Sequence, residues 1–140
     1  MINVFENIGF EINGIKHISG NEAILCIKQG AIIIDIREFY DINYKVFDVE
    51  NALNIPKTEL EKNLNLVPDD KALIIADAFG INSKLIVMQL VNNGIKNVAN
   101  LIGGILDWEK DGLPVKKDLK GELNGPCLCM LKTREKLANK

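Results

Sequence analysis

Short apolar runs alternate with segments of helical periodicity between residues 15 and 110. The apolar runs predict five strands, at residues 15–18, 31–36, 52–55, 72–76 and 97–100. The segments between them predict four helices, which begin near Ser19, Thr58, Ser83 and Gly103. The run 31–36 is apolar up to its end, which is typical of a strand covered on both faces. The alternation therefore predicts a three-layer α/β fold, with a mainly parallel central sheet flanked by helices on both faces.

Two of the predicted helices have a start signal of the capping-box type. Ser19 is followed by Glu22 and Thr58 by Glu61, so each pair has the spacing at which the side chains satisfy the first free N–H groups. The first helix is expected to end at Gly30, and the second near Pro68.

The charge distribution divides the chain into a body and a tail. Residues 1–14 read as an amino-terminal extension, 15–115 as one domain, and 116–140 as a basic carboxy-terminal tail that contains Cys-x-Cys. The first 115 residues carry a net charge of −6 and the tail +4. A basic tail could fold onto the acidic body, bind an acidic partner, or simply keep the tail in solution.

Composition narrows the class of protein. A net charge of −2 gives no indication of nucleic-acid binding, and no apolar run has the length of a membrane span. The first residues do not resemble a signal peptide, and three cysteines do not suggest a disulfide framework, so we expect a cytoplasmic protein. His17, the single histidine, has no acidic cluster beside it and is expected to be structural, so no metal site and no cofactor are expected.

The most informative segment joins the strand 72–76 to the helix that begins near Ser83. A tight strand–loop–helix turn points successive backbone N–H groups at one spot, backed by the positive end of the helix dipole. Such a turn is an anion cradle, and Asp77 stands at its mouth. The expected cradle residues are Ala78, Phe79, Gly80, Ile81, Asn82 and Ser83.

Three motifs in this order resemble the rhodanese family, a sulfurtransferase fold that some phosphatases share. They are Asp-Ile-Arg-Glu at 35–38, the spacing of Gly80, Ser83 and Gly94, and Gly-Gly-x-x-x-Trp at 103–108 followed by Gly-Leu-Pro at 112–114. The resemblance covers roughly residues 16–115. It implies that Asp35 and Arg37 support the site at the carboxyl ends of the strands. Arg37 is expected to pair with Asp77 or Glu38.

The loop departs from the family pattern at the two positions that carry its chemistry. Sulfur-transferring members have a loop resembling Cys-x-x-Gly-x-Arg, in which the cysteine holds a persulfide and the arginine holds the anionic donor. The matching positions here are Asp77 and Asn82. Sulfur exchange needs a thiolate, which a carboxylate cannot replace. A second family motif, Gly-His-Ile-x-Gly-Ala, is also missing from residues 47–52.

Asp77 therefore leaves several readings open. Its carboxylate could accept the N–H groups of its own loop and make the site inert. It could also be an aspartyl nucleophile or a metal ligand, although no acid or base accompanies it in sequence. A phosphatase activity is the least favoured reading, because the loop has neither the thiol nor the arginine.

The remaining thiols suggest a second hypothesis. Cys26 lies between apolar residues of the first helix and is expected to be a buried apolar side chain. Cys127 and Cys129 follow Pro126, which suits the first turn of a helix, where the dipole favours the thiolate. The first hypothesis is thus a non-catalytic binding or regulatory module that binds a protein partner. The alternative is a sulfurtransferase or persulfide carrier that takes sulfur from a sulfane donor onto Cys127 or Cys129.

Overall fold

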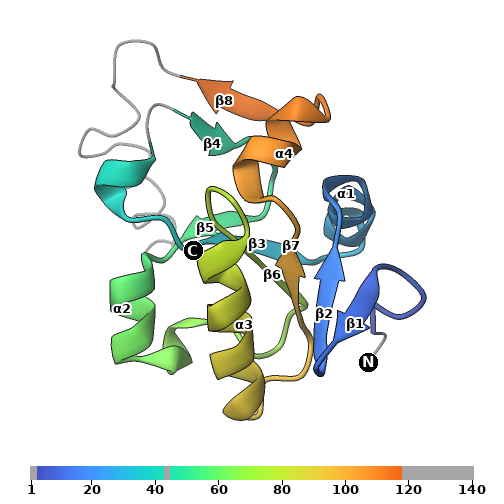
Figure 1. Ribbon diagram of the computed structural model, residues 1–140, viewed down its shortest axis with the longest axis vertical. Helices are drawn as coiled ribbons and strands as arrows, with labels where there is room; N and C mark the ends of the chain where they lie inside the picture. The colour runs from blue at the N-terminus through green and yellow to red at the C-terminus, as the bar shows by residue number, and fades with distance from the viewer. Residues whose placement is uncertain (1–2, 43–44, 118–140) are drawn as a thin grey trace.

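A six-stranded sheet forms the centre of the molecule. The computed structural model describes residues 3–42 and 45–117. The strand order across the sheet is β1-β2-β7-β6-β3-β5 (Figure 1). The strands are β1 (Phe10–Ile12), β2 (Ile15–Ile18), β3 (Ile32–Asp35), β5 (Ala52–Asn54), β6 (Leu73–Ala76) and β7 (Val98–Leu101). β1 pairs antiparallel with β2, and the other four pairings are parallel.

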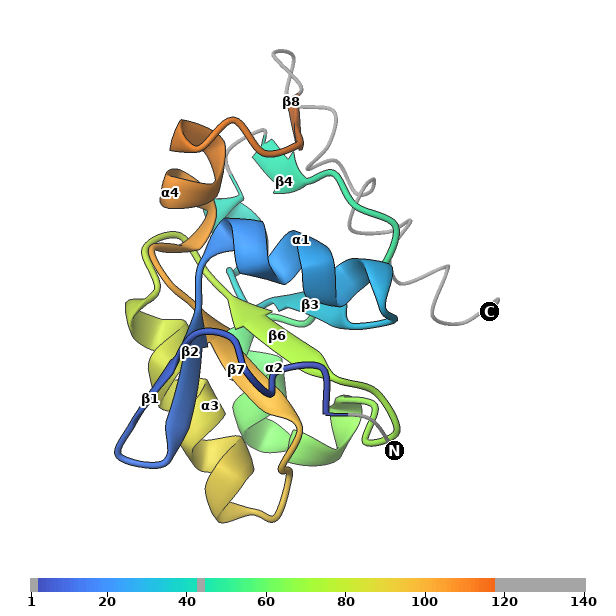
Figure 2. The same cartoon turned by 90° about the vertical axis from the view of Figure 1, so that its right-hand side faces the viewer.

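Helices cover both faces of this sheet, which confirms the expected fold class. On one face, Ala23 and Cys26 of α1 (Gly20–Lys28) and Trp108 of α4 (Gly104–Lys110) pack into one apolar cluster. On the other face, α2 (Lys57–Lys62) and α3 (Ile81–Asn92) pack into a second cluster. Figure 2 shows α1 and α3 on opposite sides of the strands. The 3₁₀ turns are η1 (Phe39–Asp41) and η2 (Leu64–Leu66).

The central strands β6 and β7 are apolar except for Asn100, because both of their faces are covered. Every residue of β6 and β7 is buried. The register pairs Asp35, at the end of β3, with Ala76, at the end of β6. Asp35 and Asp77 therefore leave the sheet at the same edge, where sites of parallel α/β sheets are found.

The sheet is larger than the predicted strands alone would make it. Residues 10–12, within the expected amino-terminal extension, form β1, and Phe5 is buried in the cluster around α1. A separate two-stranded antiparallel sheet joins β4 (Lys45–Phe47) to β8 (Val115–Lys117). The start of the expected tail, residues 116 and 117, thus pairs with a segment about seventy residues earlier in the chain.

The two predicted capping boxes have different outcomes. In α1 the Ser19 hydroxyl accepts the Glu22 N–H and the Glu22 carboxylate accepts the Ser19 N–H, as predicted. The capping box at Thr58 is wrong, because α2 begins at Lys57 and its N-cap residue is Pro56, two positions before Thr58. The Thr58 N–H and hydroxyl instead donate to the carboxylate of Glu38, each over 3.0 Å. α2 also ends earlier than expected, at Lys62.

Within the described residues, no helix combines the length and the apolar character needed to cross a bilayer.

Candidate functional site

The loop after β6 is held in place by the start of α4. The Ile105 N–H donates to the Asp77 carbonyl over 2.9 Å, and the Leu106 N–H donates to the Ala78 carbonyl over 3.1 Å. Gly80 has φ +90°, and a Cβ built there would lie 2.7 Å from the Gly103 nitrogen. A side chain at residue 80 would therefore be strained and would collide with backbone. α3 begins directly after Gly80, at Ile81 rather than near Ser83 as the sequence predicts.

The carboxylate of Asp77 lies inside the cradle. It accepts hydrogen bonds from the backbone N–H groups of Gly80, of Asn82 over 2.8 Å and of Ser83 over 3.2 Å. Asp77 is only 5% exposed. These are the N–H groups that the first turn of a helix leaves unpaired and that would otherwise hold an anion. The anion that the cradle binds is thus the carboxylate of the protein's own Asp77.

A chain of buried polar side chains continues from this carboxylate into the sheet. The Ser83 hydroxyl donates to the Asn100 carbonyl oxygen and also lies 3.4 Å from Asp77 Oδ1. The Asn100 amide nitrogen lies 3.2 Å from His17 Nδ1. Because Asn100 uses its oxygen for Ser83, its NH₂ group donates to His17, whose Nδ1 must be the unprotonated nitrogen.

The sequence does not reveal this connection. His17 is buried in β2, which lies between β1 and β7 in the sheet. The parallel register places His17 opposite Asn100, and nothing in the sequence specifies that register. Burial, and secondarily the charge of Lys84, lower the pKa of His17 from its ordinary value of 6.5. The ring of Phe10 stacks on the other side of the imidazole.

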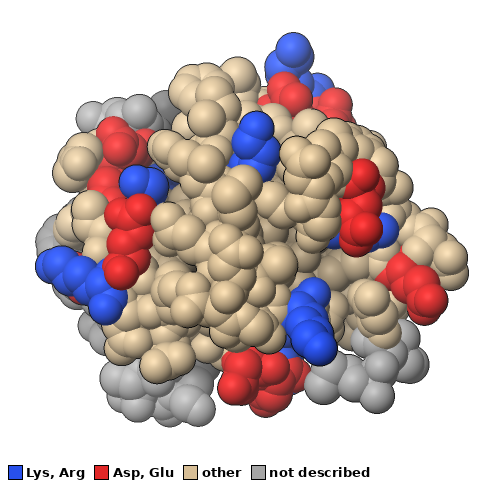
Figure 3. Space-filling model, turned by 60° about the horizontal axis from the view of Figure 1, so that its bottom comes forward, with Lys and Arg blue, Asp and Glu red and all other residues tan. Residues whose placement is uncertain are grey.

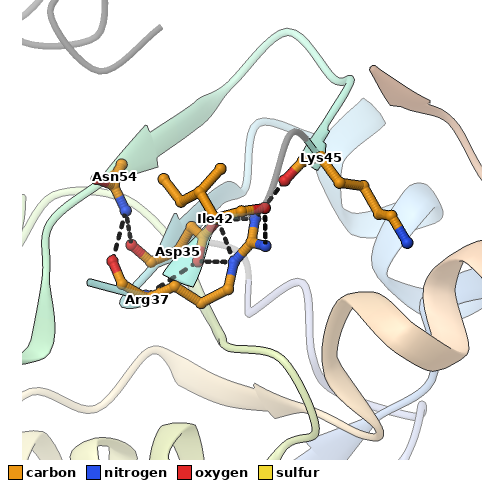
Figure 4. Close-up of polar contacts among 5 residues, drawn as sticks. All are labelled: Asp35, Arg37, Ile42, Lys45 and Asn54. Atoms are coloured by element: carbon orange, nitrogen blue, oxygen red, sulfur yellow. Dashed lines mark hydrogen bonds and ion pairs between the residues drawn. The ribbon is translucent and has the colours of Figure 1, made fainter. Parts of the chain in front are cut away.

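Arg37 does not pair with Asp77 or Glu38, so that expectation is wrong. Its guanidinium contacts the carboxylate of Asp35, with Nη2 2.7 Å from Oδ2 and Nε 3.0 Å from Oδ1 (Figure 4). It also donates to the carbonyls of Ile42 over 3.1 Å and Lys45 over 2.8 Å. Both members of the ion pair are buried. The fork of Arg37 therefore ties the backbone of Ile42 and of Lys45 to the end of β3.

Asn54 completes this second cluster from the neighbouring strand β5. Its side-chain nitrogen donates to the carbonyls of Asp35 over 2.7 Å and Arg37 over 3.2 Å, as Figure 4 shows. Asp35 and Arg37, the two expected supporting residues, thus form a structural clamp at the carboxyl edge of the sheet.

The side chains around the mouth of the loop are mostly apolar. Phe79 and Ile81, both expected cradle residues, expose 62% and 64% of their surface. Asn82 is exposed where the family pattern has an arginine. The cradle is thus made by backbone and by Asp77, and its rim offers no cation at position 82.

The thiol and metal expectations have separate outcomes. Cys26 is 1% exposed, as predicted, and burial, followed by the charge of Glu22, raises the pKa of its thiol to about 11. Cys127 and Cys129 lie outside the described residues. Among the residues that the structure describes, no group of three or more His, Cys, Asp and Glu side chains could hold a metal ion.

The fold and the strand–loop–helix site define a class of protein, and comparison with known families identifies it. The family model for the rhodanese-like domain matches residues 20–111. The chain therefore belongs to the rhodanese-like domain family.

The relatives include small single-domain enzymes. The chain is 28% identical over 100 residues to thiosulfate sulfurtransferase GlpE of Haemophilus influenzae, covering 71% of this chain and 93% of that protein. It is 30% identical over 95 residues to the same-named protein of Coxiella burnetii, covering 67% and 87%. The crystal structure of a rhodanese-like domain protein from Staphylococcus aureus superposes with a TM-score of 0.61 at 28% identity, covering 74% of this chain and all of that one.

Proposed function

We propose that this protein is a rhodanese-like binding module whose loop does not transfer sulfur. The observation that carries the proposal is the carboxylate of Asp77, which occupies the cradle and accepts three of its backbone N–H groups. A second negative charge entering this site would meet that carboxylate, and the loop has Asn82 where the family pattern has an arginine. The fold is retained while the thiol and the cation of the family's reaction are absent from the loop.

The chemistry of the relatives explains why the carboxylate is decisive. In sulfur transfer a thiolate attacks the outer sulfur of thiosulfate, forms a sulfur–sulfur bond and releases sulfite. Asp77 has no sulfur with which to form the persulfide. The buried Cys26, with its raised pKa, lies in the cluster on the opposite face of the sheet from α3 and is a poor substitute.

The test compares the full-length protein with Asp77→Cys and Asp77→Ser. We expect no thiosulfate:cyanide turnover from the natural protein. Asp77→Cys places a thiol in the cradle and should add one reducible sulfur after thiosulfate treatment, seen by intact mass spectrometry. Asp77→Ser makes a similar change of size without a thiol and should add none.

Turnover by the natural protein would contradict the proposal if Asp77→Ser abolished it. Turnover that survives Asp77→Ser but is lost with Cys127→Ser and Cys129→Ser would support the alternative function, a persulfide carrier that uses the tail thiols. The Cys-x-Cys sequence at 127–129 is the observation that favours this alternative.

A further inference from the structure

Large apolar side chains are exposed on the side of the molecule that carries the loop and α3. Ile81, Leu85 and Met88 have the spacing of residues on one face of a helix, and each is at least 40% exposed. Exposed apolar residues that gather in one area mark sites of interaction, whereas scattered ones do not. We call the following set the α3 face: Phe10, Phe79, Ile81, Leu85, Met88 and Leu106.

Hydrogen bonds and packing contacts connect the outlying members of the α3 face to the helix. Phe79 belongs to the loop that leads into α3, and Leu106 donates its N–H to the carbonyl of Ala78, next to Phe79. Phe10 stacks on His17, whose strand packs against α3. Figure 1 shows α3 in front, with α4 above it and β1 beside β2 on the right. The apolar surface thus extends from the mouth of the loop along α3 and towards β1.

The charge of this surface differs from that of the rest of the body. No acidic residue occurs between Asp77 and Asp107, whereas Lys84 and Lys96 do. Residues 1–115 as a whole carry a net charge of −6. Figure 3, which brings the bottom of the view in Figure 1 forward, shows a broad uncharged area with basic side chains within it and acidic side chains near its margins.

Lys84 is the cation at the centre of the α3 face. Helical spacing places it beside Ile81 and Met88. Its charge contributes to the lowered pKa of His17, the imidazole on which Phe10 stacks. Among the described residues it makes no ion pair. A partner that covers these side chains must supply a negative charge, because a lysine buried without one is costly.

Charge complementarity selects among the possible occupants. A second copy of the chain that used the same face would bring Lys84 against the α3 face residues and its own Lys84, with no carboxylate among them. Residues 118–140 carry a net charge of +2 and would also add positive charge. We infer that the α3 face binds a segment of a partner protein that presents apolar side chains with carboxylates among them. This inference rests on the proposed function and names the chemistry of the partner.

The two parts of such a segment would have different roles. Burial of apolar surface on Ile81, Leu85 and Met88 supplies most of the affinity. A carboxylate at Lys84 adds specificity and sets the orientation of the segment. The loop contributes Phe79 to the same surface, so the partner would lie across the cradle mouth without entering it.

The experiment uses two synthetic helical peptides of about 18 residues, or five turns. Both have leucine along one face, and the flanking positions are glutamate in one peptide and lysine in the other. Binding to the full-length protein is measured by fluorescence anisotropy. We expect the glutamate peptide to bind at least about tenfold more tightly than the lysine peptide. Lys84→Glu should reverse that preference.

Lys28→Glu is the matched control, because it makes the same charge change on α1, at the opposite face of the sheet. It should leave the preference unchanged. Equal binding of the two peptides, no binding of either, or indifference to Lys84→Glu would overturn the inference. Turnover plays no part in these readouts, so a sulfur-transfer activity would refute the proposed function without affecting the peptide result.

Two further outcomes identify a different occupant. Sedimentation that shows a dimer which Leu85→Ser dissociates would assign the α3 face to a second copy. NMR signals of residues 118–140 that shift in full-length Leu85→Ser would assign it to the tail. Either result would overturn the inference in favour of that occupant. Leu85 is 44% exposed, so its replacement by serine should leave the fold intact.

Discussion

Replacing Asp77 by alanine should unmask the anion cradle. The carboxylate is buried and accepts the N–H groups of Gly80, Asn82 and Ser83. Each buried N–H left without a partner costs about 1–3 kcal/mol, and water that enters the space recovers part of this. We therefore expect Asp77→Ala to lower the free energy of unfolding by about 2–4 kcal/mol.

Urea denaturation of the full-length protein in a buffer without polyvalent anions measures this loss. Asp77→Asn keeps one carbonyl oxygen in the cradle and should lose about half as much stability. Asp70→Ala is the matched control, since it removes an exposed carboxylate that lies shortly before β6. It should change the free energy of unfolding by less than about 0.5 kcal/mol.

Added sulfate then separates an anion cradle from an ordinary buried carboxylate. The emptied cradle of Asp77→Ala offers unpaired N–H groups at the start of α3, so it should bind sulfate. Sulfate at about one hundred times its Kd would restore about 2.7 kcal/mol. Sulfate also stabilises folded proteins in general. The relevant quantity is therefore the increase in the free energy of unfolding that sulfate causes in Asp77→Ala, minus the increase that it causes in Asp70→Ala. Equal gains in both variants, or an Asp77→Ala protein as stable as the natural one, would refute the reasoning.

Three other predictions concern buried groups. Because the pKa of His17 is lower in the folded protein, the unfolded chain binds the proton first as the pH drops, and the free energy of unfolding should fall below pH 6.5. Urea titrations at several pH values should show that His17→Gln reduces this decline. Arg37→Lys keeps the positive charge but loses the forked hydrogen bonds to Asp35 and to the carbonyls of Ile42 and Lys45. Thermal unfolding should therefore show a free energy of unfolding that is lower by about 2–4 kcal/mol, and a decrease under about 0.5 kcal/mol would contradict the clamp. Cys26, with a pKa of about 11, should resist a thiol reagent at pH 8 in the folded protein and react with it in urea; rapid labelling of folded Cys26 would show that it is not buried. The free energy of unfolding should also decline above pH 9.0, because the thiol of the unfolded chain ionises before that of the folded protein.

The parts of the fold that depend on local pattern were predictable. The capping box of Ser19 and Glu22 involves residues three apart, and the apolar run of β6 reports burial on both faces. The three family motifs placed the strand–loop–helix unit correctly. Several failures have a common cause, which is competition from residues that are distant in the sequence. Thr58, for example, has a plausible local partner in Glu61 but donates to Glu38.

The candidate site also has parts that the sequence predicts and parts that it does not. Arg37 was correctly assigned to the carboxyl edge of the sheet, but its carboxylate partner is Asp35, only two residues away, rather than Asp77 or Glu38. The other acceptors of Arg37 are carbonyls, which no sequence pattern marks as ligands. The strands β4 and β8 were missed because each is three residues long and is stabilised by pairing with the other.

The sequence by itself determined the α/β alternation and the absence of a thiol and an arginine at the two key loop positions, since these are properties of the residues present. Only the tertiary structure decided where the polar groups of the site are directed. The positive φ at Gly80, the start of α3 at Ile81 and the contact with α4 aim three N–H groups at Asp77. The register between β2 and β7 brings His17 to Asn100. Hydrogen bonds depend on position within a few tenths of an ångström, and that precision arises only when the whole domain has packed.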